Sequence, residues 1–405
     1  MNLVALCLAY IRARPLNAVL NLLLLGLGVG TMVMLILFGA QLEKRLVRDA
    51  RGIDLVIGAK GSPLQLILSS IYHVDFPTGN IPLDEVERWR EHPQVAEAIP
   101  IALGDSLAGF AIVGTEHAYP AHYGAKLASG RLWSEPFEAT LGAAVAARTG
   151  LKVGDTFAGS HGLAIGGPVH ADEPFTVVGI LEPTASALDR LVLTAVESVW
   201  LAHGMEPEGH GHEAARGHEA ESRPLEITSL LLRYRTPLAA VQLPRLVNQE
   251  SALQAASPAI ETARLLSLVG VGLDTLRGFG LLLIAASGLS VFIALWSAMQ
   301  ERRYDLAVVR TLGATRRTLL AQLLLEGLLM AAGGALLGLA LGHGTAELIG
   351  RLVPSAQAMG LSGLAWRIEE AYVLALALGI GLLAALPPAL QAYRTDIAAM
   401  LSSRA

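Results

Sequence analysis

The stretch that decides the fold is Glu301–Thr318, which reads ERRYDLAVVRTLGATRRT and lies between two long apolar runs. Arginine occupies positions 302, 303, 310, 316 and 317 of this short segment. Lys and Arg residues in short loops hold those loops on the cytoplasmic side of a membrane. The stretch therefore predicts a cytoplasmic loop that joins two membrane spans.

The same loop carries a helical pattern. Leu306, Val309 and Leu312 form an apolar stripe at helical spacing. Gly313 is suited to the end of that helix, and Thr315 is suited to the N-cap of the next one. A short amphipathic helix with charged flanks favours docking into a groove on a soluble partner. The alternative is an anchor that fixes membrane orientation and does nothing else.

The segments Glu301–Asp305 and Val309–Arg317 resemble the cytoplasmic coupling segment of the MacB/FtsX-like permeases, which are type VII ABC transporters. Pro387–Arg394 and Ile397–Leu401 are similar to the closing pattern of that family, although Ile397 replaces its usual proline. The resemblance implies a homodimer and a separate ATPase subunit that carries ATP and Mg²⁺. It implies that the ATPase docks on Glu301, Arg302, Arg303, Tyr304, Asp305, Leu306, Val309, Arg310, Leu312, Gly313, Arg316 and Arg317.

Composition agrees with a membrane protein that has a soluble part. The 405 residues are 53% hydrophobic and only 16% charged, with a mean hydropathy of +0.50. This is too apolar for an ordinary soluble protein, and the central charges are too many for a chain lying wholly in the membrane. The net charge of −5 gives no reason to expect nucleic acid binding. A single cysteine, Cys7, excludes a disulfide within the chain and a Cys-based zinc site.

The fold class we expect is an α-helical membrane protein with four transmembrane helices and an α+β extracytoplasmic domain inserted between the first two, as the resemblance implies. Asn17–Ala40 is free of charge and long enough to cross the bilayer, and we favour an uncleaved span over a signal peptide. Both termini are then cytoplasmic, and the protein is a multi-pass protein of the inner membrane. The expected parts are a cytoplasmic amphipathic helix (1–16), the first transmembrane helix and stalk (17–51), the extracytoplasmic domain (52–264), a stalk and second transmembrane helix (265–300), the coupling loop (301–318), the third transmembrane helix (319–344), a short outer loop (345–370), the fourth transmembrane helix (371–391) and a cytoplasmic tail (392–405).

The outer domain shows short strand-like and helix-like runs in mixed order, which indicates an α+β arrangement. The basic residues Lys44, Arg45, Arg48 and Arg51 lie at its start, on the side where positive charge is unusual, but large domains translocate largely regardless of charge. Strands are expected at Ile53–Ile57, Phe110–Val113, Phe175–Ile180, Leu191–Thr194 and Ile227–Tyr234. Helices are expected at Leu83–Glu91, Leu141–Thr149, Ala195–Ala202 and Leu238–Ala255.

Small residues and one acid mark the spans. Gly334, Gly338 and Gly342 recur every fourth residue on one face of the third span, and this spacing predicts a close contact with another helix. Glu326 stands inside the same span. Ionisable residues in spans commonly mark ion paths, but one glutamate near an interface is more simply a structural or coupling residue.

A histidine-rich stretch lies in the outer domain. His203, His210, His212 and His218 alternate with glutamates, glycines and alanines, a composition typical of a surface loop. Imidazole nitrogens suit Zn²⁺, so these four histidines are a candidate zinc site, and zinc is the one cofactor we consider for this chain itself. The alternative is a solvated polar insertion whose histidines only titrate near neutral pH.

The chain lacks the motifs of the common hydrolases. Neither G-x-x-x-x-G-K-[ST] nor G-x-S-x-G occurs, which indicates a permease subunit rather than an enzyme. The leading hypothesis is an ABC permease whose outer domain acts on a periplasmic or membrane-extracted substrate, with membrane lipid around it and a periplasmic protein or lipoprotein as partner. A second hypothesis is an FtsX-like regulator of a periplasmic cell-wall enzyme without transport. A third is a metal-responsive assembly.

Overall fold

The computed structural model describes residues 3–161, 173–205, 224–301, 310–311, 313–353, 356 and 360–394. The chain forms two compact units. A helical unit comprises Met1–Leu42 and Val269–Ala405, and an outer unit comprises Glu43–Leu268. Both boundaries between the units fall inside a helix, so the chain is helical where it passes from one unit to the other.

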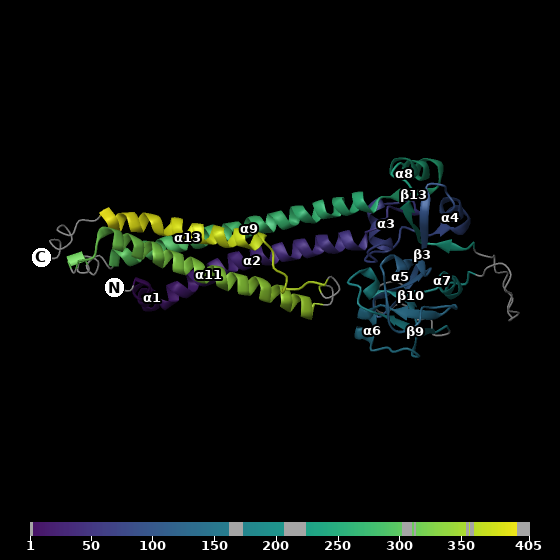
Figure 1. The fold of residues 1–405 in the computed structure, drawn as a ribbon, viewed down its shortest axis with the longest axis horizontal. Helices are drawn as coiled ribbons and strands as arrows, with labels where there is room; N and C mark the ends of the chain where they lie inside the picture. The colour runs from purple at the N-terminus through teal and green to yellow at the C-terminus, as the bar shows by residue number, and fades with distance from the viewer. Residues whose placement is uncertain are drawn as a thin grey trace. The chain divides into compact units, whose positions relative to one another are not determined.

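The helical unit holds the membrane spans. Four helices are long and apolar enough to cross a membrane: α2 (Pro15–Asp49), α9 (Pro258–Glu301), α11 (Arg316–Leu352) and α13 (Glu369–Arg394). A shorter apolar helix, α1 (Leu3–Ala13), precedes them, and Figure 1 shows α11 and α13 side by side. Four candidate spans with an α+β domain between the first two confirm the predicted fold class.

The third span begins as the sequence predicts and ends later. Thr315 caps α11 by accepting a hydrogen bond from the Thr318 N–H, and Gly313 has a φ of 103° that favours glycine. At the other end α11 continues to Leu352, where Arg351 Nε donates to Glu347 Oε1 at 2.7 Å. This intrahelical ion pair supports the additional turns. Helix α11 therefore extends into the range 345–370 expected for the short outer loop, and α13 begins at Glu369 near the end of that range.

The outer unit is built on a mixed sheet of eleven strands among the described residues. The order is β13-β1-β12-β3-β4-β10-β6-β9-β5, with β7 paired to β9 and β8 paired to β3, and β11 pairs β2 separately. The strands are β1 (Leu55–Ala59), β2 (Ile81–Pro82), β3 (Val95–Leu107), β4 (Phe110–Thr115), β5 (Leu127–Gly130), β6 (Glu138–Leu141), β7 (Thr156–Phe157), β8 (Ser160–His161), β9 (Phe175–Leu181), β10 (Val192–Thr194), β11 (Glu226–Ile227), β12 (Ser229–Tyr234) and β13 (Leu253–Ala256).

Short helices complete the outer unit, and two apolar cores hold it together. One core includes Leu55, Trp89 and Leu230, and the other includes Leu141, Phe175 and Val192. Burial of such side chains is the main favourable term in folding a unit of this kind. The helices are α3 (Pro63–Ser70), α4 (Leu83–Arg90), α5 (Ala118–His122), α6 (Ala143–Thr149), the 3₁₀ helix η1 (Ala187–Arg190), α7 (Val196–Ala202) and α8 (Ala239–Glu250).

Two of the expected helices are wrong in part. The run Leu238–Ala255 contains α8 but ends in strand β13, because Leu253–Ala256 pairs with β1. The run Leu141–Thr149 begins in strand β6, and helix α6 starts only at Ala143. In both cases pairing with a distant strand overrides the local helical pattern. The long strand β3 (Val95–Leu107) has no counterpart among the expected elements.

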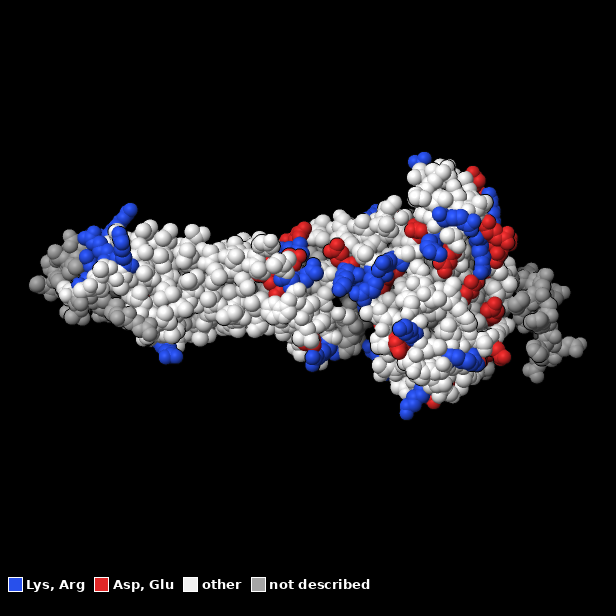
Figure 2. All heavy atoms as spheres, in the orientation of Figure 1, with Lys and Arg blue, Asp and Glu red and all other residues white. Residues whose placement is uncertain are grey.

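Charge is distributed unevenly over the helical unit. On the face drawn in Figure 2, Lys and Arg gather at the end near the two chain termini, and most of the surface beside them is free of charge. Positive charge at this end matches a cytoplasmic face, and the uncharged surface matches the hydrocarbon core of a bilayer.

Candidate functional site

The predicted coupling loop is described only at its two ends. Glu301 is the last residue of α9 and forms an ion pair with Arg14. Arg316 and Arg317 are exposed in the first turn of α11, and Gly313 is exposed just before it. Arg310 is half-buried, and its carbonyl accepts a hydrogen bond from the Gly313 N–H at 3.0 Å. The other predicted docking residues, Arg302–Leu306, Val309 and Leu312, lie outside the described residues, so the docking site stays a prediction.

The glycine face of the third span lies directly against the first span. A Cβ atom placed on Gly338 would be 2.5 Å from Val29 Cβ and 2.9 Å from Gly26 O. Gly334 lies in the same way against Leu25, and Gly342 lies against Val33. Because real Cβ atoms do not approach other atoms this closely, α11 and α2 can meet at this distance only through glycine.

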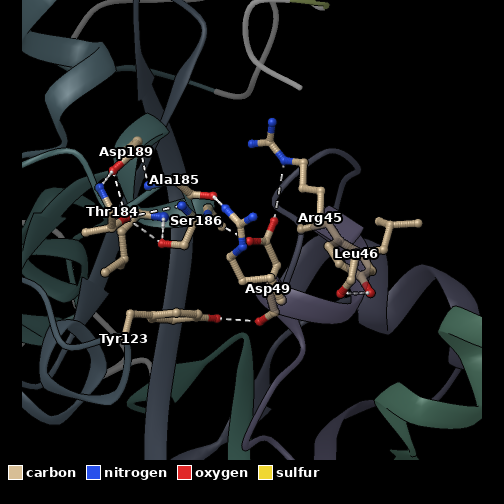
Figure 3. Close-up of polar contacts among 12 residues, drawn as sticks. Arg45, Leu46, Asp49, Tyr123, Thr184, Ala185, Ser186 and Asp189 are labelled. Carbon is tan, nitrogen blue, oxygen red and sulfur yellow. Dashed lines mark hydrogen bonds and ion pairs between the residues drawn. The ribbon is translucent and has the colours of Figure 1, made fainter. Parts of the chain in front are cut away.

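The end of α2 is fixed into the outer unit by a buried carboxylate. The Asp49 side chain is 1% exposed and accepts a hydrogen bond from the Ala187 N–H at 3.1 Å. Arg45 Nε lies 3.6 Å from Asp49 Oδ2, one helical turn earlier. Tyr123 donates its hydroxyl to the Asp49 carbonyl at 2.7 Å, as Figure 3 shows. Two separate parts of the outer unit, at Ala187 and at Tyr123, thus contact the last turn of α2.

A compact turn receives these contacts. Asp189 accepts hydrogen bonds from the N–H and hydroxyl of Thr184, both at 2.7 Å, and from the Ala185 N–H at 2.8 Å. Ala185 has a φ of 57°, an unusual value for a residue with a Cβ atom. Arg48 Nη1 donates to the carbonyl of this same Ala185 at 2.7 Å. The turn is therefore held from inside by Asp189, as Figure 3 shows, and the Arg48 hydrogen bond ties it to α2.

One tyrosine connects both long helices within the outer unit. Tyr72 Oη lies 3.2 Å from the carbonyl oxygen of Leu46 in α2 and 2.6 Å from Oγ1 of Thr262 in α9. All three residues are buried. Since a carbonyl oxygen can only accept a hydrogen bond, the Tyr72 hydroxyl donates to Leu46 O and accepts a hydrogen bond from the Thr262 hydroxyl. We call Leu46, Asp49, Tyr72, Tyr123 and Thr262 the helix junction.

Burial suppresses ionisation of the aromatic groups near the junction. Burial, followed by the positive charge of Arg190, lowers the pKa of His73 to about 3, so this ring is neutral at physiological pH. Its Nε2 atom is 2.9 Å from Tyr119 Oη. Burial also raises the pKa values of Tyr119 and Tyr123, which keeps both hydroxyls protonated and able to donate. The polar groups of the junction thus form hydrogen bonds between separate segments of the outer unit.

The basic residues at the end of α2 are a partial sequence signal for this junction. Lys44, Arg45, Arg48 and Arg51 stand on the outer side against the usual charge bias. The structure gives two of them a role, because Arg45 faces Asp49 and Arg48 binds the 184–189 turn. The contact between Tyr72 and Thr262 could not be predicted from the sequence pattern, since the two residues are 190 positions apart in the chain.

The predicted zinc residues are only partly described. His210, His212 and His218 lie outside the described residues. His203 is the C-cap residue of α7, where its Nδ1 atom is 2.8 Å from the Val199 carbonyl and its Nε2 atom is 3.8 Å from Asp105 Oδ1. Among the described residues no group of three or more His, Cys, Asp or Glu residues is arranged to hold a metal ion. Zinc binding by this stretch stays a prediction.

A cavity of about 550 Å³ opens in the outer unit between α4 and α7. Trp133 and Trp200 contribute to its lining, together with Glu87, Glu116 and Glu197. Arg90 also lines it, and its Nη2 atom pairs with Glu116 Oε1 at 2.7 Å. Three carboxylates against one arginine make this lining negative, and the size is that of a typical ligand site.

Four candidate spans, an α+β domain between the first two and an arginine-rich stretch between the second and third define the architecture of a multi-pass membrane protein with an outer domain. A family profile described as the MacB-like periplasmic core domain matches residues 18–236, more than half of the chain. A second profile, the FtsX-like permease C-terminal, matches residues 277–397. The chain therefore belongs to the MacB/FtsX-like permeases, which are membrane subunits of ABC transporters that work with a separate ATPase. It is a multi-pass membrane protein with a periplasmic domain.

Solved structures resemble the outer part only distantly. The periplasmic region of MacB from Actinobacillus actinomycetemcomitans is 13% identical with a TM-score of 0.34, and the match covers 54% of this chain and 95% of that one. The extracellular domain of the noncanonic ABC-type transporter YknZ from Gram-positive bacteria is 11% identical with a TM-score of 0.31, covering 50% and 98%. No curated protein matches the chain.

Proposed function

We propose that this permease couples ATP hydrolysis by a separate cytoplasmic ATPase to movement of its periplasmic domain. In this proposal it works as a homodimer in the inner membrane. The observation that carries the proposal is the helix junction. Both chain crossings between the units are unbroken helix, and Tyr72 binds the two helices to each other where they enter the outer unit. A displacement of either helix would therefore reach the domain without passing through a flexible linker.

The input of this coupling is the loop between α9 and α11. Its apolar stripe, Leu306, Val309 and Leu312, supports docking into a groove of the ATPase, and its arginines support a position at the cytoplasmic surface. Charges in the membrane spans are few, which favours transmitted motion over a polar path through the helices. The periplasmic domain is the output in this proposal.

The docking step can be tested with a double substitution. Leu306→Asp with Val309→Asp places two charges on the apolar stripe, and burying an unpaired charge at an interface is strongly unfavourable. We expect the variant to lose recruitment of the ATPase in co-purification and to lose ATP turnover in the reconstituted complex. The matched control is Ala307→Asp with Thr311→Asp, which adds the same charge on the opposite side of the predicted helix. Full recruitment by the Leu306/Val309 variant would refute the docking assignment.

The cavity between α4 and α7 is our candidate for contact with a substrate or partner protein. Two tryptophans contribute to its lining, and its carboxylates favour a positively charged group. Identification of whatever co-purifies with the native complex separates the two leading hypotheses. A carried lipid, peptide or lipoprotein supports transport, whereas a captured cell-wall hydrolase supports the regulatory alternative.

A further inference from the structure

The segment between α11 and α13 is fastened firmly to the helical unit. Ser362 exchanges two hydrogen bonds with the Gln41 side chain of α2, both at 2.9 Å. The Gly363 N–H donates to Glu347 Oε2 at 3.0 Å, and the Gly363 carbonyl lies 2.6 Å from Nδ1 of His343. These contacts bind the segment to two different helices, so its backbone is held in one place.

The same segment exposes three large apolar side chains. Leu364, Trp366 and Ile368 are 75%, 72% and 74% exposed. They occupy alternate positions in the chain, with Ala365 and Arg367 between them. Isolated exposed apolar residues are common on proteins, but three of this size on one fastened segment indicate a surface that something covers.

The level of these side chains relative to the bilayer follows from α13. Residues 371–393 carry no charge, and twenty of them span about 30 Å, the thickness of the hydrocarbon core. Glu370 therefore marks the outer boundary of the core. His343 Nε2 lies 3.0 Å from Glu370 Oε2, and the Trp366 ring is centred 4.4 Å from the His343 ring. Trp366 thus lies at the level where the hydrocarbon core meets the headgroups.

The exposed apolar surface continues from this segment onto the membrane-facing side of α13. Tyr372, in the first turn of α13, is 71% exposed, and Leu383 further along is 67% exposed. Trp and Tyr at this level are characteristic of membrane interfaces, where the ring lies among headgroups. Arg367 lies between the apolar residues and can keep its charge among lipid phosphates while its stem covers apolar surface.

We propose that residues 363–368 form a lipid-docking segment that inserts Leu364, Trp366 and Ile368 into the periplasmic leaflet of the membrane. Interfacial side chains of this kind reach about 5–10 Å into the boundary between headgroups and acyl chains. Because the segment also holds Gln41 of α2 through Ser362, it fixes the first span to the membrane surface just before that helix leaves the helical unit.

The test uses the full chain in vesicles of phosphatidylcholine and phosphatidylglycerol. A fluorophore that responds to its surroundings is attached to Leu364→Cys in a Cys7→Ser background. Leu383→Cys in α13 is the lipid-facing reference, and Leu238→Cys, which is 58% exposed in the outer unit, is the aqueous reference. We expect lipids brominated near the headgroup to quench the label at position 364 about twofold and aqueous iodide to leave it nearly unchanged.

Two results would overturn the proposal. Iodide quenching at position 364 equal to that at position 238, without quenching by brominated lipid, would place the segment in water. Protection from both quenchers would mean that protein covers it, as in a contact with a second copy. Intrinsic fluorescence gives an independent reading, because replacing Trp366 with Phe should remove the tryptophan signal that shallow brominated lipid quenches. An equal loss of signal in the wild type and in this variant would contradict insertion of Trp366.

Discussion

Removing the Tyr72 hydroxyl tests whether the helix junction is a real mechanical connection. Tyr72→Phe keeps the buried ring but deletes the bonds to Leu46 O and Thr262 Oγ1. Each buried hydrogen bond contributes about 1 kcal/mol net, and the Leu46 carbonyl is left without this partner. We therefore expect a loss of about 2 kcal/mol in the free energy of unfolding of the outer unit.

The loss should be visible as a change in melting temperature. For a unit of this size, 1 kcal/mol shifts Tm by about 2–4 °C, so Tyr72→Phe should lower Tm by about 4–8 °C. The assay is thermal unfolding of the full-length protein in lipid nanodiscs, followed by the ellipticity of its sheet. Tyr234→Phe is the matched control, because the structure gives that half-buried hydroxyl no hydrogen-bond partner among the described residues.

A functional readout separates stability from coupling. In the complex with its ATPase, Tyr72→Phe should weaken the response of ATP turnover to whatever binds the periplasmic domain, while basal turnover remains. The double variant Tyr72→Phe with Thr262→Val measures the contact between the two helices as a coupling energy. A Tm shift no larger than that of Tyr234→Phe, with additive effects in the double variant, would refute the junction as a connection between α2 and α9.

Three further predictions address the glycine face, the buried histidine and the zinc hypothesis. Gly338→Leu should destabilise the helical unit by about 1–3 kcal/mol, because any side chain there collides with Val29. Gly344→Leu should be tolerated, since nothing lies within 4 Å of a Cβ atom added at that position. Measurements of thermal stability in detergent compare the two variants. His73 is neutral in the folded state with a pKa of about 3, so its contribution to stability is complete above pH 6.5 and is lost as pH falls from 6.5 towards 3. His73→Asn tolerates the positive φ of 50° and should make the unfolding free energy of the full chain depend less on pH in that window; an unchanged pH dependence would contradict the assignment. Replacing His210, His212 and His218 with Ala should remove the zinc uptake that calorimetric titration measures at neutral pH. Zinc uptake by the wild type should fade as pH falls through about 6.5, where free imidazole gains its proton. Equal uptake by both proteins would leave only the solvated-insertion interpretation.

Hydropathy and short-range chemistry predicted the helical unit well. The four spans follow from charge-free runs, and the Thr315 cap follows from the residue types at a helix start. The charge-free runs and the helix cap both depend on residues that are close together in the sequence, so both can be predicted from local sequence patterns. The glycine spacing of the third span likewise indicated a contact surface, although it could not indicate that Leu25, Val29 and Val33 of the first span form the other side.

The outer unit and the junction were harder because distant residues decide them. Leu253–Ala256 looks like the end of a helix but becomes a strand because Val56 and Ile57 supply its partner. In the sequence, Asp49 is an ordinary charged residue of the stalk. Its role becomes visible only in the folded chain, where Asp49 accepts hydrogen bonds from the Ala187 N–H and the Tyr123 hydroxyl. Neither partner is recognisable from the residues around positions 49 or 253, since only the folded chain brings them together.

The glycine face has a consequence for how the first and third spans can move. Leu25, Val29 and Val33 each lie in a notch made by Gly334, Gly338 or Gly342, and the notches repeat every four residues. If α2 slid gradually along α11, the three α2 side chains would leave the glycine positions at the same time and would collide with the neighbouring side chains of α11. A new fit exists only after a shift of four residues, about 6 Å. The glycine face therefore resists axial sliding of α2 against α11, because all three contacts would have to break together.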